Sequence, residues 1–121
     1  MDFEIIRKNC YSYFEKALYE ETCDVILVEK EQKCIGTGIV FYYDSVPSKI
    51  NLTGKNAYIT GMYVEPEYRG RGVAKEILRR VISRVSGKGY KVIMLNASDM
   101  GRPLYEKVGF QEIHGGMILH Y

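Results

Sequence analysis

The clearest pattern in the chain is a periodic arrangement of apolar and charged positions over residues 73–85. Apolar residues recur every three or four positions, as they do on one face of an α-helix, and polar residues fill the positions between them. We expect this amphipathic helix to begin at Val73, and two glycines, Gly87 and Gly89, to end it. Its apolar face consists of Val73, Ala74, Ile77, Leu78, Val81, Ile82 and Val85.

A second helical pattern lies near the N-terminus. Tyr11, Phe14 and Leu18 recur at helical spacing and predict a helix over residues 9–21. Ser12 followed by Glu15 fits a capping box, in which the two side chains bond to backbone N–H groups of the first turn.

Four short apolar runs predict β-strands, at residues 24–29, 33–43, 57–64 and 91–96. The sequence EKEQK between the first two predicts a hairpin turn, and the polar stretch 44–56 predicts a loop. Gly36 and Gly38 indicate a bulge or a close backbone approach in the second strand. Pro66 ends the third strand. The run 91–96 is almost continuously apolar, which is typical of a strand buried on both faces.

The C-terminal part of the chain predicts one more helix and a hairpin. Residues 98–108 begin with a capping residue, Ser98, carry Pro103 near the start and are followed by Gly109, so we expect a short helix there. Residues 110–113 and 117–121 then predict a final hairpin around Gly115 and Gly116. The strand–helix–strand order across 57–96 is a βαβ crossover, which makes its two strands parallel neighbours.

Length and composition favour one ordinary domain over residues 1–121, with 46% hydrophobic and 26% charged residues. No apolar run approaches the roughly 20 residues that span a bilayer, and the first residues do not resemble a secretory signal. We therefore expect a cytoplasmic protein that makes no membrane contact. Cys10, Cys23 and Cys34 are odd in number and widely spaced, which argues against a disulfide framework and against a metal site.

Positive charge is concentrated around the amphipathic helix. Residues 69–91 contain eight Lys or Arg against one acid, Glu76, which gives this segment a net charge of +7 and the rest of the chain −5. Gly70 and Gly72 lie between Arg69 and Arg71, in a turn that leads directly into the helix. The free N–H groups and the dipole of a helix N-terminus favour an anion, and glycine allows phosphates to approach the backbone. The alternative is a tight turn with no ligand.

Two known phosphate-binding motifs do not fit this turn. A P-loop requires a Gly-Lys-Ser/Thr ending that is missing here, and the dinucleotide fingerprint requires a third glycine where Lys75 stands. A nucleic-acid-binding helix is a further alternative, but one helix carries nearly all the charge and the chain as a whole is close to neutral. We therefore expect no nucleic-acid partner.

At this point the sequence resembles a known family. VEPEYRGRGVAKEIL resembles the acetyl-CoA signature of the GNAT N-acetyltransferase superfamily, Arg/Gln-x-x-Gly-x-Gly/Ala, which Arg69, Gly72 and Ala74 fill. Residues 104–110, LYEKVGF, resemble a second signature of the same superfamily. The resemblance covers about residues 24–121, and within the superfamily these motifs look most like those of bacterial members.

The resemblance implies a mixed α/β (α+β) fold, with a mostly antiparallel sheet and helices on both faces. Its parallel strands, 57–64 and 91–96, splay apart, and acetyl-CoA, the co-substrate, lies between them. No metal is implied. The residues that would contact acetyl-CoA are Met62, Tyr63 and Val64 in the first strand, Arg69, Gly70, Arg71, Gly72, Val73, Ala74 and Lys75 in the signature turn, and Asn96, Ser98, Gly101 and Arg102 beyond the second strand.

The resemblance also implies a reaction, direct attack of a primary amine on the thioester, in which Tyr105 protonates the departing thiolate. Many relatives carry a glutamate base in the strand before the signature, but residues 57–64 contain no carboxylate. The other polar candidates for that role, none of them preferred, are Tyr58, Thr60, Glu29, Glu65 and Asp44. Tyrosines that would line the acceptor pocket, or simply pack in strands, are Tyr42, Tyr43, Tyr58 and Tyr63.

Only about 23 residues precede the strand 24–29, fewer than relatives have there, and residues 3–6 fit a stub of the missing first strand. In relatives these early elements help to build the acceptor pocket, and a homodimer is one way to complete it here. The charge of −5 outside the basic segment favours a cationic acceptor, so we expect a small-molecule or peptide amine. The competing hypothesis is a CoA-binding regulatory or interaction module that has the fold without acceptor chemistry.

Overall fold

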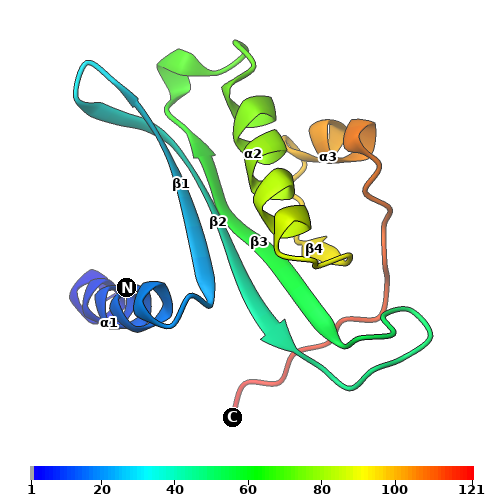
Figure 1. Cartoon of the computed structure of the whole chain (residues 1–121). Coiled ribbons are helices and arrows are strands. Elements are labelled where there is room, and N and C mark those ends of the chain that lie inside the picture. The colour runs from blue at the N-terminus through cyan, green and yellow to red at the C-terminus, as the bar shows by residue number, and fades with distance from the viewer. Residues whose placement is uncertain (1) are drawn as a thin grey trace.

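The computed structural model describes residues 2–121 and contains a four-stranded mixed sheet with three α-helices (Figure 1). The strands stand in the order β1-β2-β3-β4, antiparallel except for the last pair. The elements in chain order are α1 (Phe3–Tyr19), β1 (Cys23–Lys30), β2 (Lys33–Asp44), β3 (Lys55–Val64), a 3-10 turn η1 (Pro66–Tyr68), α2 (Val73–Gly87), β4 (Ile93–Leu95) and α3 (Arg102–Val108). The predicted mixed sheet with one parallel pair is confirmed.

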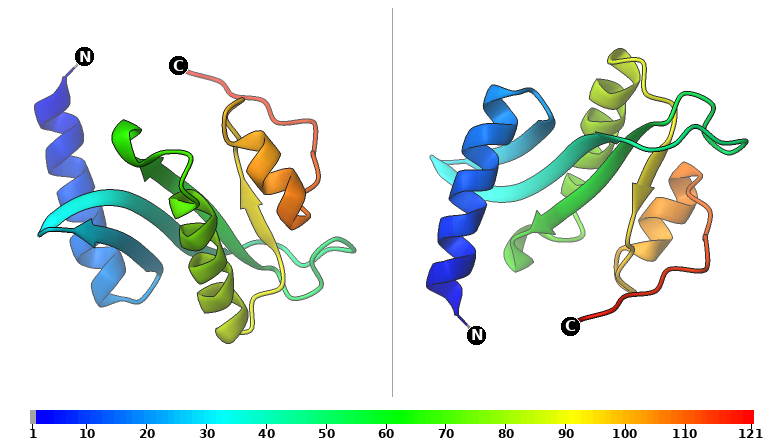
Figure 2. Two further views of the ribbon diagram at one scale, coloured as in Figure 1. Left: turned by 90° about the horizontal axis from the view of Figure 1, so that it is seen from above. Right: turned by 90° about the horizontal axis from the view of Figure 1, so that it is seen from below.

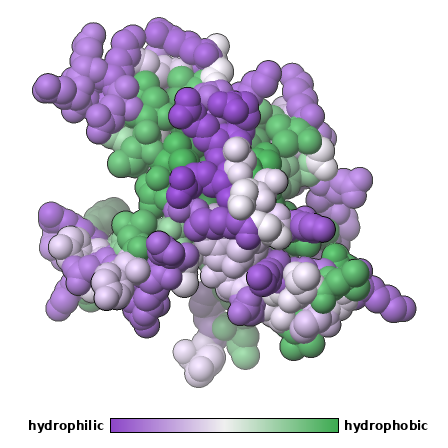
Figure 3. Space-filling view, viewed as in Figure 1, coloured by the Kyte–Doolittle hydropathy of each residue, from purple (hydrophilic) through white to green (hydrophobic). Residues whose placement is uncertain are grey.

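The helices lie on both sides of the sheet. α2 crosses in front of the strands in Figure 1 and α3 lies farther back, whereas α1 stands beside β1 and runs from back to front, as Figure 2 shows from above and below. In Figure 3 hydrophilic side chains follow the outer surface of α2, and hydrophobic ones are visible on either side of it. α2 thus has the amphipathic character that the periodicity of residues 73–85 predicts.

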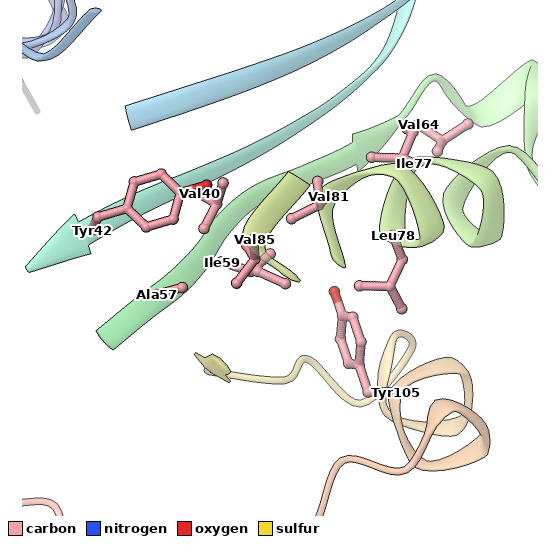
Figure 4. Close-up of a cluster of buried hydrophobic side chains, with 10 residues drawn as sticks. All are labelled: Val40, Tyr42, Ala57, Ile59, Val64, Ile77, Leu78, Val81, Val85 and Tyr105. Atoms are coloured by element: carbon pink, nitrogen blue, oxygen red, sulfur yellow. The ribbon is translucent and has the colours of Figure 1, made fainter. Parts of the chain in front are cut away.

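The core lies between α2 and the middle strands. Ile77, Leu78, Val81 and Val85 of α2 are fully buried, and Val40 of β2 is their fully buried counterpart in the sheet (Figure 4). Burying side chains of this size stabilises a fold by about 1.5–3 kcal/mol each. The face predicted for the amphipathic helix therefore forms the centre of the molecule.

Two glycines allow α2 to lie close to β2. A Cβ built on Gly38 would stand 2.4 Å from Ile77 Cγ2, and one on Gly36 would stand 3.1 Å from Ile77 Cδ1. The predicted close backbone approach is therefore correct. A β-bulge lies beside Gly38, but its extra residue is on β3: Thr37 and Ile39 pair with Tyr63 and Thr60, so that two residues, Gly61 and Met62, stand opposite Gly38.

A buried carboxylate ties the end of α2 to β1. Oδ2 of Asp24 accepts a hydrogen bond from the Tyr42 hydroxyl at 2.6 Å and lies 3.0 Å from Lys88 Nζ, and Oδ1 accepts one from Arg84 at 2.9 Å. Burial alone would raise the pKa of this carboxyl, but the hydrogen bonds from Tyr42, Arg84 and Lys88 outweigh burial and lower the pKa to about 2. The same burial and the bond to Asp24 raise the pKa of Tyr42.

The N-terminal helix begins earlier than the sequence pattern predicted. Its N-cap is Asp2, whose side chain accepts the N–H of Ile5 at 3.2 Å, so that residues 3–6 form the first helical turn and not a strand stub. Ser12 and Glu15 lie inside the helix, and the predicted capping box is wrong. Asp is as good an N-cap residue as Ser, and the cap nearer the N-terminus prevails.

The C-terminal third departs from prediction in three places. β4 covers only Ile93–Leu95 and is half-buried, not buried on both faces, because it forms an edge of the sheet. Ser98 caps the turn before α3 by accepting the N–H of Gly101 at 3.1 Å, and it does not cap the helix itself. Residues 110–121 form no hairpin, since nearly all are exposed and a ribbon of two strands without packing is marginal. Gly109, with φ 118°, ends α3 as predicted.

The predicted turn at residues 31–32 and the loop between β2 and β3 are present. Among residues 2–121, no helix has the length and apolar character needed to cross a bilayer.

Candidate active site

The signature turn leaves the start of α2 open. Gly70 and Gly72 have φ angles of 77° and 82°, in the left-handed region that favours glycine, and a Cβ built on either would meet nothing within 4 Å. Gly72 is the N-cap of α2, and no side chain caps this end of the helix. The first N–H groups of α2 therefore point out of the helix without an internal acceptor.

The side chain of Arg69 holds the turn against the end of β3. Its Nε donates a hydrogen bond to the carbonyl of Val64 at 2.8 Å, and its guanidinium lies 5.4 Å from the centre of the Tyr63 ring. The Arg71 guanidinium stands 5.6 Å from the centre of the Tyr68 ring. The two arginines therefore contribute positive charge beside the open helix end while their side chains rest on neighbouring aromatic rings.

A cavity of about 510 Å³ opens beside this turn. It is bounded by the end of β3, the turn, the first residues of α2 and the start of α3. Of the residues predicted from sequence, those that line it are Met62, Tyr63, Val64, Arg69, Gly70, Gly72, Val73, Ala74, Lys75, Ser98, Gly101 and Tyr105.

Three predicted residues lie outside the lining of the cavity, namely Arg71, Asn96 and Arg102. Asn96 is exposed just beyond β4, and Arg102 is half-buried with its guanidinium 3.8 Å from Glu112. Sequence reasoning missed three lining residues, Tyr68, Met100 and Leu104. Leu104 stands inside the LYEKVGF motif, so its position next to Tyr105 was an available signal. Tyr68 likewise stands inside VEPEYRGRGVAKEIL, next to Arg69, whereas Met100 carries no such signal.

The cavity exists because β3 and β4 diverge. β4 pairs with β3 only where Ala57–Ile59 meets Ile93–Leu95. On its other side β3 continues to pair with β2 as far as Val64. Among residues 2–121, no strand therefore lies beside the edge of residues 60–64 that faces away from β2, and the cavity lies against this edge at Met62–Val64.

Tyr105 enters the cavity from α3. Its side chain is buried and points past β3 toward Leu78 of α2 (Figure 4). The Tyr105 hydroxyl makes no hydrogen bond to another described residue. Every fully buried polar side-chain atom among these residues does have a hydrogen-bond partner, so the hydroxyl oxygen is not fully buried and is open to the cavity. Burial raises the pKa of Tyr105, which keeps the hydroxyl protonated at neutral pH and able to donate a proton.

The structure separates the tyrosines that the sequence grouped together. Tyr42 points toward α2 and is held by Asp24, so it does not face an acceptor. Tyr63 lies under Arg69 at the cavity. Tyr43 and Tyr58 lie on the opposite face of the sheet, with Phe41 between them.

No Asp or Glu lines the cavity within the described part of the chain. The five candidates for the base lie outside the cavity lining: Glu29 and Asp44 are exposed near strand ends, Glu65 follows β3, and Tyr58 and Thr60 are on the face of β3 that points away from α2. A group of His, Cys, Asp and Glu residues suited to a metal ion is not found among residues 2–121.

The fold and this cavity define a class of protein. The model of the acetyltransferase (GNAT) family matches residues 2–110, and the chain belongs to that family. A predicted acetyltransferase from Clostridium acetobutylicum, whose crystal structure contains acetyl-CoA, is 34% identical and superposes with a TM-score of 0.90 over 95% of this chain and 75% of its own. A GCN5-related N-acetyltransferase from Ralstonia eutropha, 19% identical, shares the fold with a TM-score of 0.88 over 97% of this chain and 77% of its own.

Among curated relatives, the thialysine N-epsilon-acetyltransferase of Bos taurus is 31% identical over 88 residues, which is 70% of this chain and 49% of that protein. The corresponding enzyme of Sus scrofa is 28% identical over 89 residues. The chain spans about half the length of these curated relatives.

Proposed function

We propose that the protein is an N-acetyltransferase that moves the acetyl group of acetyl-CoA to a primary amine. The observation that carries the proposal is the cavity of about 510 Å³ that joins the open N-terminus of α2 to the Tyr105 hydroxyl. An anion site at one end and a proton donor at the other suit a thioester linked to a pyrophosphate. The acetyl-CoA in the Clostridium relative, 34% identical, supports the same choice of co-substrate.

The pyrophosphate would lie on the signature turn. The amides of residues 69–74 surround the N-terminus of α2, and the left-handed glycines Gly70 and Gly72 leave room for phosphate oxygens. Arg71 and Lys75 are both exposed beside the turn and add charge there.

The thioester would lie along the unpaired edge of β3. The main-chain groups of Tyr63 point toward β2, on the same side as the Glu65 N–H that bonds to the Ile35 carbonyl. The main-chain groups of Met62 and Val64 point to the open edge at the cavity, where they would bind the pantetheine arm and polarise the thioester carbonyl. One of them, the Val64 carbonyl, already accepts a bond from Arg69, so the N–H groups are the better candidates. Asn96 and Arg102, which lie outside the cavity lining, would act at most at its margin.

The reaction needs no nucleophile from the protein. The amine nitrogen attacks the carbonyl carbon, the C–N bond forms, and the C–S bond then breaks to release the CoA thiolate. Tyr105 would give its proton to that sulfur, while the proton lost from the amine passes to water and water in turn restores the tyrosine. Holding the two reactants together is the main contribution of the protein.

The test is a calorimetric titration of the purified chain with acetyl-CoA, with NAD and ATP as controls, followed by a thiol-release assay with a panel of primary amines. We expect micromolar binding of acetyl-CoA alone, and amine-dependent release of CoA. Absence of acetyl-CoA binding would contradict the proposal.

A second candidate function is a CoA-binding module without turnover. The observation in support of this second candidate is that no Asp or Glu among the described residues lines the cavity, so no carboxylate there would deprotonate an ammonium. Acetyl-CoA binding without CoA release in the presence of any amine would support this second function.

A further inference from the structure

The face of the sheet that points away from α2 carries a row of aromatic side chains. Val40 and Tyr42 of β2, and Ala57 and Ile59 of β3, are buried on the α2 side. Because side chains alternate along a strand, Phe41 and its neighbours point to the other side. This aromatic face, as we call it, consists of Ile39, Phe41 and Tyr43 of β2, Tyr58 and Thr60 of β3, and Met94 of β4.

The rings on the aromatic face stand close together. Phe41 and Tyr58 are paired across β2 and β3, and their ring centroids are 5.2 Å apart with an angle of 30° between planes. Tyr43 continues the row, 5.9 Å from Phe41 at 35°. Each ring is therefore tilted by 30–35° relative to its neighbour, and each of the three is at least partly exposed. Such a surface offers π-faces to a flat or apolar group.

Among the described residues, none of the strand positions on this face carries a charged side chain. By the same alternation the neighbouring positions on β1 are Cys23, Val25 and Leu27, which pair with Phe41, Ile39 and Thr37. Met94 pairs with Tyr58 from β4. α1 stands beyond β1 and α3 beyond β4, and no helix of residues 2–121 crosses the middle of the face in Figure 2.

The aromatic face is continuous with the cavity through β3. At Gly61, whose φ is 60°, the bulge adds one residue to the strand, and this reverses the alternation. Tyr58 and Thr60 therefore face the aromatic side, whereas Met62 packs toward the core and lines the cavity. Thr60, at the end of this face, is two to four residues along the strand from Met62–Val64, whose backbone groups would hold the thioester, and Tyr58 is four to six residues from them.

We propose that the aromatic face binds the acetyl acceptor, and that the acceptor is a primary amine attached to an uncharged aromatic body. This inference rests on the proposed acetyl transfer and adds the class of acceptor to it. Flat rings provide area for an aromatic group, and the absence of charged side chains leaves nothing to pair with the carboxylate of an amino acid. The amine end then reaches along β3 past Thr60 toward the thioester.

The same face bears on the missing base. An ammonium that leaves water for an apolar surface has a lowered pKa, since desolvation disfavours the charged form. The acceptor would therefore lose its proton to solvent on binding and arrive as the neutral amine that attacks the thioester. Chemistry of this kind does not require a carboxylate in residues 57–64, and the sequence has none there.

The test compares primary amines that differ in the group to which the amine is attached. Purified protein with saturating acetyl-CoA is assayed by thiol release with 2-phenylethylamine, n-butylamine, lysine, thialysine and spermidine. We expect kcat/KM for 2-phenylethylamine to exceed that for lysine and thialysine by at least about tenfold, which corresponds to about 1.4 kcal/mol of preferential binding. A preference for lysine, thialysine or spermidine would overturn the inference while leaving acetyl transfer intact.

Variants locate the binding. Phe41→Ala should raise the KM for 2-phenylethylamine about tenfold and leave the KM for acetyl-CoA unchanged, whereas Phe41→Leu, which keeps apolar volume, should have a smaller effect. Tyr11→Ala, at an exposed position on α1, is the control, and far-UV circular dichroism verifies folding of all three. An unchanged KM for the amine in Phe41→Ala would overturn the inference.

Two further outcomes would overturn the acceptor proposal, and a third would refute the proposed function. Sedimentation measures whether a second copy covers the face: a dimer that dissociates in Phe41→Ala would assign the rings to self-association and overturn the acceptor proposal. Acetyl-CoA binding without turnover of 2-phenylethylamine would overturn it as well. Loss of acetyl-CoA binding itself, which Phe41 is too remote to cause, would instead refute the proposed function from which this inference starts.

Discussion

Replacing the buried carboxylate at the base of α2 should make the protein less stable, by an amount that depends on pH. Asp24 accepts hydrogen bonds from the Tyr42 hydroxyl and from Arg84 and forms an ion pair with Lys88, and only 11% of its side chain is exposed. The substitution Asp24→Asn keeps the size and removes the charge. Tyr42 can still donate to the amide oxygen, but the two cations lose their partner.

The pKa of Asp24 gives the magnitude. Its lowering from 3.8 to about 2 corresponds to about 2 kcal/mol of folding free energy. The folded-state pKa lies below that of the unfolded chain, so the contribution is complete above about pH 5 and disappears as pH falls toward 2. We expect Asp24→Asn to lower the free energy of unfolding by about 2 kcal/mol at pH 7 and by about half as much at pH 3.

Urea unfolding followed by circular dichroism at pH 7, 4.5 and 3 measures this difference. Glu76→Gln is a matched control, because Arg79 and Arg80 lower the pKa of Glu76 to about 2 as well, but in an exposed position where solvent screens the charges. It should change stability much less at every pH. An Asp24→Asn deficit of equal size at pH 7 and pH 3 would refute the electrostatic reasoning.

Three other substitutions test the site and the core. Tyr105→Phe should lower turnover about a hundredfold with little change in acetyl-CoA affinity or in melting temperature, since its hydroxyl bonds to no described residue; equal activity would make Tyr105 a packing residue. Gly72→Asp should weaken acetyl-CoA binding in calorimetry by at least about tenfold, whereas Gly72→Asn, which tolerates the φ of 82° and carries no charge, should weaken it less. Gly38→Val should cost about 1–3 kcal/mol or more in urea unfolding, because its Cβ would stand 2.4 Å from Ile77 Cγ2; full stability would contradict the close packing of α2.

Most of the fold was predictable from the sequence because its elements carry strong local signals. The periodicity of residues 73–85 predicted the helix that forms the core. Gly36 and Gly38 predicted a bulge or a close backbone approach in β2, and α2 is the element that packs there. The errors occurred where local signals compete. Ser12 with Glu15 and Asp2 with Ile5 are both acceptable helix starts, and only the longer helix shows which one is used.

The strand and hairpin errors have a different origin. Residues 91–96 and 110–121 contain apolar residues, but whether such runs form buried strands depends on a neighbouring strand at the right distance. β4 obtains a neighbour for three residues only, and the C-terminal segment obtains none among the described residues. Pairing partners are a property of the tertiary structure, which periodicity along one segment does not contain.

For the site, the sequence motif located the turn and Tyr105 but not what lies on the two sides of β3. That division depends on Gly61. Without the extra residue of the bulge, Tyr58, Thr60 and Met62 would all lie on one face of the sheet, and the aromatic row would continue into the cavity wall. With it, the strand presents rings on one side and Met62 on the other. A Cβ at position 61 would stand 2.5 Å from Ile39 Cδ1 at a φ of 60°, so glycine is what keeps the bulge and the two surfaces distinct.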